Sequence, residues 1–407
     1  MAGGFSVGIL STNSPKTCQV IAESSEMDIF VVDNDRQLQK IIQIQGHLKH
    51  LKAIVQYKEE IRTRLQNLYS WRGFLDLADG VSEGTLNQVI DSQKPNRCCA
   101  LLYSMLIAGP PKPVMLSHDN ITWTTETAAQ TLSYKCPPEE QEVLVSLLPL
   151  SYLTAQLFDV WVSISVAGAL YFAQPDALRG SLIDTLREVK PTMFYGVPWV
   201  WDRLLDSLKT SQLASTPFRR RLDKWAMCLG LRPNKRRMLG PAPPPPVLQP
   251  GQEADLQPST EVPGPAALLP VLQPGLSGAT TEYFLSLNMP ICELYGLSES
   301  TGVHTLSRQE GFRLLSCGKS LPSTRTKTQK EDEDAIGDIH IWGQTSSWGT
   351  STMRRKPRRR SISMAGCARG TRAFWTMTNS STSRATKGIS SPSVQVRRST
   401  RTPSRSG

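Results

Sequence analysis

The chain has 407 residues, 39% of them hydrophobic, which is enough for two or three domains with apolar cores. Its formal net charge is +11, but 14 of the 46 Lys and Arg residues lie in 346–407, a segment that contains no Asp or Glu. Residues 1–345 therefore carry 32 basic against 35 acidic residues, a net charge of −3, which argues against a basic nucleic-acid-binding face outside that segment.

The remaining bulk features favour a cytoplasmic protein. The eight cysteines are scattered without metal-ligand spacing, which indicates reduced thiols. The N-terminus has no basic stretch followed by a long apolar run, so no signal peptide is expected. The most apolar region, residues 160–173, is 14 residues long and too short to span a bilayer, so no transmembrane segment is predicted.

Residues 1–240 alternate between expected strands and helices. FSVGIL and MDIFVVDND predict strands, and PKTCQVIAESSE between them predicts a helix. LKAIVQY predicts a further strand and VLVSLLPL a buried one. This alternation predicts an α/β fold of layered sheets and helices.

The composition changes at residue 241. Residues 241–275 hold 11 prolines and contain PVLQPG twice, so they are expected to form neither a helix nor a central strand but a solvated linker. The PPPP run within it could make a weak contact with an SH3-type domain. Folded sequence is expected again over 276–345. Residues 346–407 contain 23 Ser or Thr and no apolar periodicity, which predicts a disordered basic tail.

Five motifs occur in one order: PKPVMLSHDNITW, SLLPLSYLTAQLFDVW, FAQPDALRGSL, FYGVPWVWDRL and YGLSESTGVH. Together they resemble the AMP-forming acyl-CoA synthetases of the ANL adenylating superfamily, and two of them look most like the bubblegum-type long-chain fatty-acid-CoA ligases. The resemblance implies an incomplete N-terminal adenylating domain, a fatty-acid substrate, and ATP, Mg²⁺ and CoA as cofactors. It implies a cytoplasmic location, with membrane association as an alternative.

The stretch that aligns with the family's phosphate loop, Y-T-S-G-T-T-G-x-P-K-G, is degenerate here. Over residues 103–113 one hydroxyl remains of four, Leu106 replaces the inner glycine, and Pro113 removes an amide. A hydrogen bond to a charged group contributes ~1.5–3 kcal/mol, so three lost hydroxyls would cost ~5–9 kcal/mol. Residues 112–120 are typical of a loop exit running into a helix, with an ordinary strand and turn as the alternative. The remaining candidates for phosphate contacts are Ser104, Gly109 and Lys112.

YGLSES matches the family's Y-G-x-[ST]-E. The resemblance implies that Tyr295 lies near adenine, that Gly296 and Ser298 contact the nucleotide, and that Glu299 binds Mg²⁺. Leu294 stands where relatives have glycine. The alternative for so short a motif is a turn with a surface Glu.

Other family positions also differ. Tyr152 and Trp199 stand where relatives commonly have His and Arg on the substrate side, and packed aromatics are the alternative. The second adenine loop, S-G-[AG]-A-P in the family, is represented by residues 277–281. The five histidines form no cluster, and His304 has no assigned catalytic role.

The tail suggests a shifted reading frame. Codons compatible with SWGTSTM and SMAGCARGT can spell M-G-Y-L-N and D-G-W-L-R-T-G-D when moved by one base, the order expected in relatives. We infer a frame change near Thr345, which removes the ribose Asp and the C-terminal Lys and makes the chain a truncated, pseudogene-like member. The run RRKPRRR could bind anions or RNA nonspecifically. We favour the alternative that this run is a by-product of the shifted reading frame.

No catalytic residue set is therefore intact. The sequence predicts a relative of long-chain fatty-acid-CoA ligases that is inactive or severely impaired. A residually active synthetase is one alternative, and a non-catalytic binding protein with an anion- or nucleic-acid-binding tail is another. No specific nucleic acid partner is expected.

Overall fold

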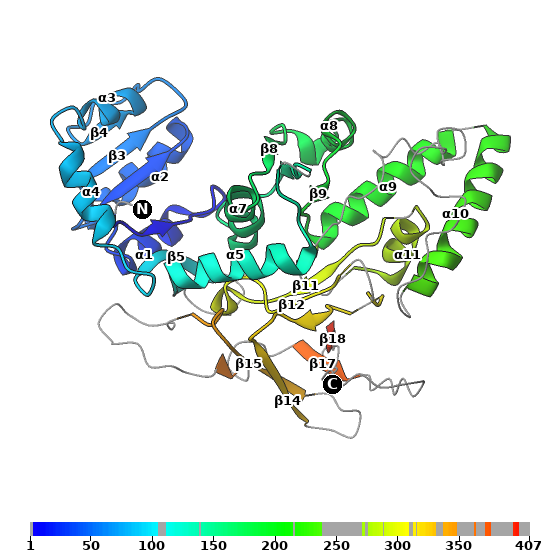
Figure 1. The fold of residues 1–407 in the computed structure, drawn as a ribbon. Coiled ribbons are helices and arrows are strands. Elements are labelled where there is room, and N and C mark those ends of the chain that lie inside the picture. The colour runs from blue at the N-terminus through cyan, green and yellow to red at the C-terminus, as the bar shows by residue number, and fades with distance from the viewer. Residues whose placement is uncertain are drawn as a thin grey trace, which may run out of the picture. The chain divides into compact units, whose positions relative to one another are not determined.

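The computed structural model describes residues 3–104, 111–137, 140–214, 216–237, 271–272, 276–287, 289–308, 312–314, 316–330, 337–347, 362–363, 371–375 and 394–398. Strands and helices alternate along much of this part of the chain (Figure 1), and the predicted α/β class is confirmed. The chain divides into two compact units. Unit 1 comprises residues 1–120, 149–151 and 347–360, and unit 2 comprises residues 121–148, 152–346 and 361–407.

Unit 1 contains two three-stranded sheets. The first has the parallel order β2-β3-β4, and the second has the order β1-β5-β6, with β1 parallel and β6 antiparallel to β5. The strands are β1 (Ser6–Val7), β2 (Ile29–Val32), β3 (Ala53–Gln56), β4 (Leu68–Ser70), β5 (Cys98–Ser104) and β6 (Lys112–Ser117). The helices are α1 (Pro15–Ser24), α2 (Asp35–Ile44), η1 (Gln45–His47), α3 (Trp71–Asp76) and α4 (Glu83–Asp91).

Local sequence explains the first helices of unit 1. Ser14 caps α1 by accepting a hydrogen bond from the Thr17 amide, and proline occupies the first helical position, where its missing N–H costs nothing. The Asn34 side chain caps α2 in the same way. The apolar sides of both helices pack with Phe30 and Ile54 of the parallel sheet into one cluster. The strands and the helix expected from the first 60 residues are therefore confirmed.

Unit 2 contains three sheets. They have the orders β8-β7-β9, all parallel, then β10-β11-β12-β13, then β14-β15-β17-β18 with β16 beside β15. The first two contain β7 (Val143–Ser146), β8 (Ala169–Phe172), β9 (Met193–Phe194), β10 (Val271–Leu272), β11 (Glu293–Tyr295), β12 (Thr305–Leu306) and β13 (Lys319–Ser320). The third contains β14 (Arg325–Lys330), β15 (Gly337–Trp342), β16 (Ile362–Ser363), β17 (Thr371–Trp375) and β18 (Val394–Arg398).

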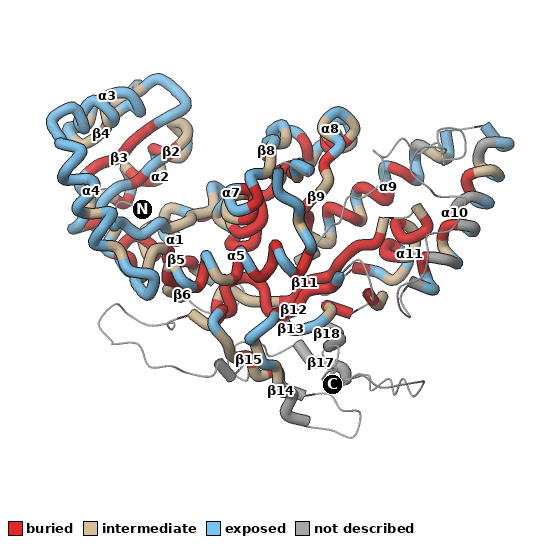
Figure 2. The backbone as a smooth tube through the Cα atoms, in the orientation of Figure 1, coloured by how far each residue is buried: buried red, intermediate tan, exposed pale blue. Residues whose placement is uncertain are grey.

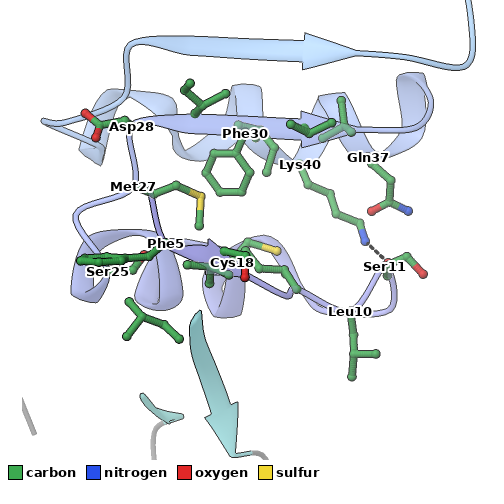
Figure 3. A pocket seen from close by; sticks show the side chains of 18 of the residues that line it. Phe5, Leu10, Ser11, Cys18, Ser25, Met27, Asp28, Phe30, Gln37 and Lys40 are labelled. Atoms are coloured by element: carbon green, nitrogen blue, oxygen red, sulfur yellow. Dashed lines mark hydrogen bonds between the residues drawn. The ribbon is translucent and has the colours of Figure 1, made fainter. Parts of the chain in front are cut away.

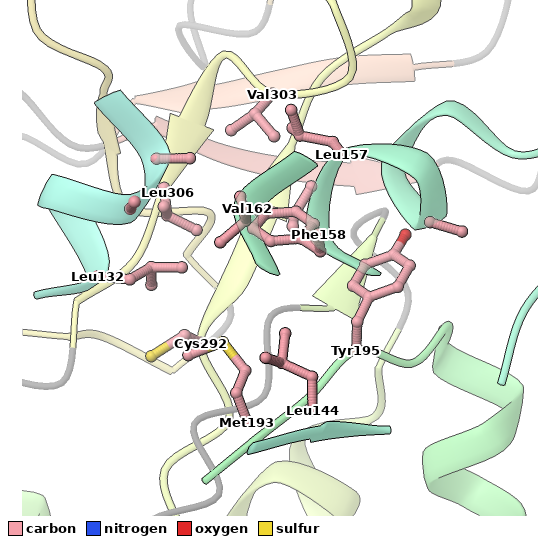
Figure 4. Close-up of a cluster of buried hydrophobic side chains, with 14 of the residues drawn as sticks. Leu132, Leu144, Leu157, Phe158, Val162, Met193, Tyr195, Cys292, Val303 and Leu306 are labelled. Carbon is pink, nitrogen blue, oxygen red and sulfur yellow. The ribbon is translucent and has the colours of Figure 1, made fainter. Parts of the chain in front are cut away.

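The helices of unit 2 are α5 (His118–Leu132, which begins in unit 1), α6 (Leu153–Ala155), η2 (Gln156–Val162), α7 (Ser163–Ser165), η3 (Ala177–Arg179), α8 (Leu182–Val189), α9 (Pro198–Ala214), α10 (Pro217–Arg237), α11 (Gly278–Ser286) and η5 (Ser298–Ser300). Apolar side chains of α5, α6 and η2 pack with those of several strands in a buried cluster (Figure 4). In it the rings of Phe158 and Tyr195 stack at a centroid distance of 5.4 Å. Leu144 of β7 packs in the same cluster, so the buried strand predicted at VLVSLLPL is confirmed.

The structure describes short strands in the proline-rich segment and in the tail. In the proline-rich segment, β10 lies at the edge of its sheet, parallel to β11, which is where a chain poor in amide donors can still pair. In the tail, the structure describes β16, β17 and β18, and β17 (TRAFW) and β18 (VQVRR) are locally rich in strand-forming residues. Disorder of the tail stays a prediction. Apart from residues 346 and 347, the other residues of both segments, including the PPPP run, lie outside the described residues.

The expectation of no basic face outside the tail is wrong. Helix α10 carries eight Lys or Arg residues and a single acidic residue, Asp223, which is buried. The tally over residues 1–345 conceals this helix because acidic residues elsewhere balance it.

Candidate functional site

The two ends of the predicted phosphate loop are arms of an antiparallel hairpin. Strand β5 ends at Ser104 and β6 begins at Lys112, and these two residues are paired in register. Helix α5 begins only at His118, so a strand of six residues stands where a direct loop-to-helix exit was expected. Pro113 is tolerated there because β6 is an edge strand. Gly109 and the four apolar residues before it lie outside the described residues.

Tyr103 fixes this hairpin to α1 within unit 1. Its hydroxyl donates to the Ile21 carbonyl at 3.2 Å and lies 2.7 Å from the Ser24 hydroxyl. Burial raises the pKa of the phenol, and the contact with Ser24 opposes that rise. The residue that opens the family motif therefore has a packing role in this chain.

The YGLSES motif spans a strand end, a tight turn and a short 3₁₀ helix in unit 2. Tyr295 closes β11, is 5% exposed and packs in an apolar cluster with Cys317, Ile339 and Ile341. Ser298 begins η5 and is partly exposed. Nucleotide contacts by either residue stay a prediction.

Gly296 has a structural reason to be glycine. A Cβ atom built there would lie 2.4 Å from the carbonyl oxygen of Gly302, so the two chain segments cross too closely for any side chain. The crossing is fixed nearby, where the Leu297 amide donates to the Ser300 hydroxyl at 2.9 Å. Thr301, at a φ of 54°, donates from its hydroxyl to the Thr345 carbonyl at 2.6 Å.

Glu299 is 6% exposed, so the alternative of a surface Glu is wrong. Among the described residues its carboxylate has no hydrogen bond or ion pair. Mg²⁺ prefers carboxylate oxygens of this kind as ligands. No group of three His, Cys, Asp or Glu side chains suited to a metal occurs in the described part of the chain. Glu299 fits Mg²⁺ only as a single protein ligand, with phosphate oxygens completing the coordination.

Two buried titratable groups lie beside the motif. Burial raises the pKa of Glu293, in β11, to about 7. Burial lowers the pKa of His304 to about 4, so the imidazole is neutral at physiological pH. The His304 Nε2 lies 2.6 Å from the Thr326 hydroxyl, which lies 2.6 Å from the Ser320 hydroxyl. Through these contacts His304, which precedes β12, connects the sheet of β12 and β13 with β14 of another sheet, a role the sequence did not indicate.

Asp159 is a buried acid that motif matching did not single out. It lies in η2, a π-helical segment, with 2% exposure, and Ser146 donates to its carboxylate at 2.8 Å. Burial raises its pKa to about 7, opposed by the Ser146 hydrogen bond. An acidic residue inside the apolar run LFDVW was the signal that could have identified it.

Three other family positions are placed as follows. Tyr152 and Trp199 are 44% and 49% exposed, so the alternative of packed aromatics is wrong for both. The expected second adenine loop instead begins α11, where the Ser277 hydroxyl caps the helix by accepting from the Thr280 amide at 3.0 Å.

A cavity of about 790 Å³ lies in unit 1 between β1 and β2 (Figure 3). Among the described residues β1 pairs only with β5 and β2 only with β3. Each of these two strands therefore has one edge that is not paired with another strand. The Lys40 ammonium donates to the carbonyls of Ser11 at 2.6 Å and Asn13 at 3.0 Å. None of the predicted site residues lines this cavity.

The fold and the ordered motifs define the class of the protein, and comparison confirms it. Residues 1–349 match the family of AMP-binding enzymes, and the chain belongs to that family. In the part of the chain that the structure describes, no helix combines the length and apolar character needed to cross a membrane.

The relatives that the chain resembles are of the bubblegum type that the motifs predicted. The chain is 44% identical over 357 residues to long-chain-fatty-acid–CoA ligase ACSBG2 of Xenopus laevis, covering 87% of this chain and 48% of that protein. It is 38% identical to human ACSBG1 over 370 residues, covering 87% of this chain and 49% of the relative. The chain therefore spans about half the length of these relatives.

Solved structures agree on the fold. ATP-bound MatB from Rhodopseudomonas palustris superposes with a TM-score of 0.61 at 17% identity, covering 97% of this chain and 63% of that one. Coronafacic acid ligase from Pectobacterium brasiliense gives 0.63 at 13% identity, covering 92% and 62%.

Proposed function

We propose that this chain is a bubblegum-type adenylating-domain protein in which ATP-dependent activation of a fatty acid is abolished or severely impaired. The relatives are long-chain-fatty-acid–CoA ligases, and the ATP-bound neighbours share the fold. A fatty acid, ATP, Mg²⁺ and CoA are thus the ligands the ancestral site would have held. The seven free thiols in the described residues support a cytoplasmic location.

The composition of the phosphate loop carries this proposal. Residues 105–108, Met-Leu-Ile-Ala, offer no hydroxyl to an anion, and the flanking Ser104 and Lys112 are joined backbone to backbone in the hairpin. Losing three hydroxyl contacts corresponds to ~5–9 kcal/mol, or on the order of 10³–10⁶ in affinity or rate. The intact YGLSES turn does not compensate, because Mg²⁺ on Glu299 needs phosphate oxygens as further ligands.

The tail supports the same conclusion. Residues 346–407 contain no match to the family's G-W-L-x-T-G-D in the frame that is read, so no residue in them is a candidate for the ribose contact. The frame change near Thr345 accounts for this, and the nucleotide sequence that encodes Thr345 to Met353 tests it. Codons for Ser347 to Thr352 that cannot spell M-G-Y-L-N after a one-base shift would refute the frame change.

Pyrophosphate exchange tests the proposal. The purified full chain is incubated with Mg²⁺, ATP, palmitate and labelled pyrophosphate, and the label entering ATP is measured. We expect no exchange above the level without palmitate. Exchange that depends on palmitate and disappears in Glu299→Ala would contradict the proposal and establish the alternative, a residually active synthetase.

A further inference from the structure

The outward face of α10 combines aromatic and cationic side chains. Phe218, Arg221, Trp225, Cys228 and Arg232 are all exposed and follow one another at intervals of three or four residues. This spacing puts them in one stripe along the helix. Phe218 is 78% and Trp225 53% exposed, which is unusual for side chains of this size.

The opposite face of α10 is held by α11, so the stripe cannot turn inward (Figure 2). A Cβ atom at Gly230 would lie 2.4 Å from the Ser286 carbonyl oxygen, which shows how closely the helices approach. The Asn234 amide donates to the Leu285 carbonyl at 3.0 Å. Lys235 pairs with Glu282 of α11 at 2.7 Å.

The charge of the exposed side is of one sign. Arg221, Lys224, Arg232 and Arg236 are exposed, whereas the helix's one acid, Asp223, is buried. The surface thus presents large apolar groups surrounded by positive charge.

We propose that this outward face of α10 docks on the surface of an anionic lipid bilayer. Trp and Phe side chains enter the headgroup region, and neighbouring Arg and Lys side chains neutralise lipid phosphates and carboxylates. A single-stranded nucleic acid would be held in a positively charged groove with stacking platforms, whereas here the aromatics project from a convex helix. Docking of this kind does not depend on adenylation, so it stands apart from the proposed function.

Co-sedimentation of the full chain with vesicles tests the proposal. We expect binding to vesicles of phosphatidylcholine and phosphatidylserine in equal parts, weakened by salt, and much weaker binding to phosphatidylcholine alone. The double variant Phe218→Ser/Trp225→Ser should lose at least about tenfold in partitioning. Arg221→Ser/Arg232→Ser should lose about 30-fold.

Matched controls separate α10 from general charge and from the basic tail. Tyr171→Ser/Phe172→Ser removes two exposed aromatics from β8, and Lys49→Ser/Lys58→Ser removes two exposed cations from unit 1. Both should bind as the unaltered chain does. Equal binding by the α10 variants and these controls would overturn the proposal. So would loss of poly-uridylate binding in the α10 variants while their vesicle binding is unchanged, since the face would then serve RNA.

Cys228 offers a second readout that does not rely on weakened binding. An environment-sensitive thiol dye on Cys228, in a chain carrying Cys98→Ser, Cys99→Ser, Cys136→Ser and Cys367→Ser, reports the polarity at the stripe itself. Its emission should shift to the blue with anionic vesicles. An unchanged spectrum at vesicle concentrations that sediment the protein would show that another surface binds, and would refute the proposal.

Discussion

At the scale of single residues, the YGLSES motif has structural roles besides the nucleotide contacts predicted for it. Gly296 allows β11 to turn beneath the Gly302 carbonyl, and Tyr295 fills an apolar cluster. The sequence identified both positions from the resemblance but assigned them only to the nucleotide. The crossing of two segments six residues apart in sequence is a tertiary feature that a motif cannot show.

Replacing Gly296 by Ala should destabilise the fold even without any nucleotide. The added methyl meets a backbone oxygen that cannot rotate away, so the free energy of unfolding should fall by about 1–3 kcal/mol. Urea unfolding followed by circular dichroism measures this. Gly278→Ala is the matched control, because a Cβ there meets no atom within 4 Å. Equal stability of the two variants would contradict the structural role.

At the scale of elements, the π-helical segment η2 places an acid in the core of unit 2. Asp159 shares this environment with Tyr195, whose phenol has its pKa raised chiefly by burial. π-helical segments often occur at functional sites, but the partner observed for Asp159 is the Ser146 hydroxyl. The described contacts therefore support a conformational role, which depends on pH.

The pKa of Asp159 gives a pH-dependent stability. It rises from 3.8 to about 7 on folding, so the folded state keeps a proton that the unfolded state releases. The free energy of unfolding therefore falls as pH rises through this window, by up to ~4 kcal/mol, and the penalty is complete above pH 7. Asp159→Asn should raise the thermal midpoint above pH 7 and leave it unchanged below 3.8.

The exposed Asp206→Asn is the matched control for this change, since Asp206 lies on the outer side of α9. Thermal unfolding of both variants across the pH range decides the matter. A gain for Asp159→Asn that is the same at low and high pH would contradict a buried, protonated carboxyl.

Elements with strong periodicity were predictable, and those fixed by pairing were not. The first strands and α1 follow from apolar runs, a Ser cap and a proline. Strand β6 was only the alternative expectation, because Lys-Pro is typical of a loop exit and only its pairing with β5 makes it an edge strand. Likewise residues 277–281 match a loop pattern in the family but begin α11 here, since Ser277 is a good helix cap.

At the scale of the whole molecule, the net charge of a long segment hides local concentrations of charge. A net charge of −3 over residues 1–345 coexists with α10, whose exposed charges are all positive. Similarly, residues 1–349 match the family of AMP-binding enzymes, yet the two parts of the predicted nucleotide site belong to different compact units. One part keeps the residues of the family motif and the other does not. The YGLSES turn is well formed, whereas the loop between β5 and β6 has lost its hydroxyls.

The central claim is that this loop composition prevents ATP binding, and calorimetric titration with MgATP tests it most directly. The unaltered chain is compared with a variant that restores the family pattern: Met105→Ser, Leu106→Gly, Ile107→Thr, Ala108→Thr and Pro113→Gly. We expect no saturable heat for the unaltered chain and measurable, magnesium-dependent binding for the restored loop, lost again on adding Glu299→Ala. Tight magnesium-dependent binding by the unaltered chain would contradict it.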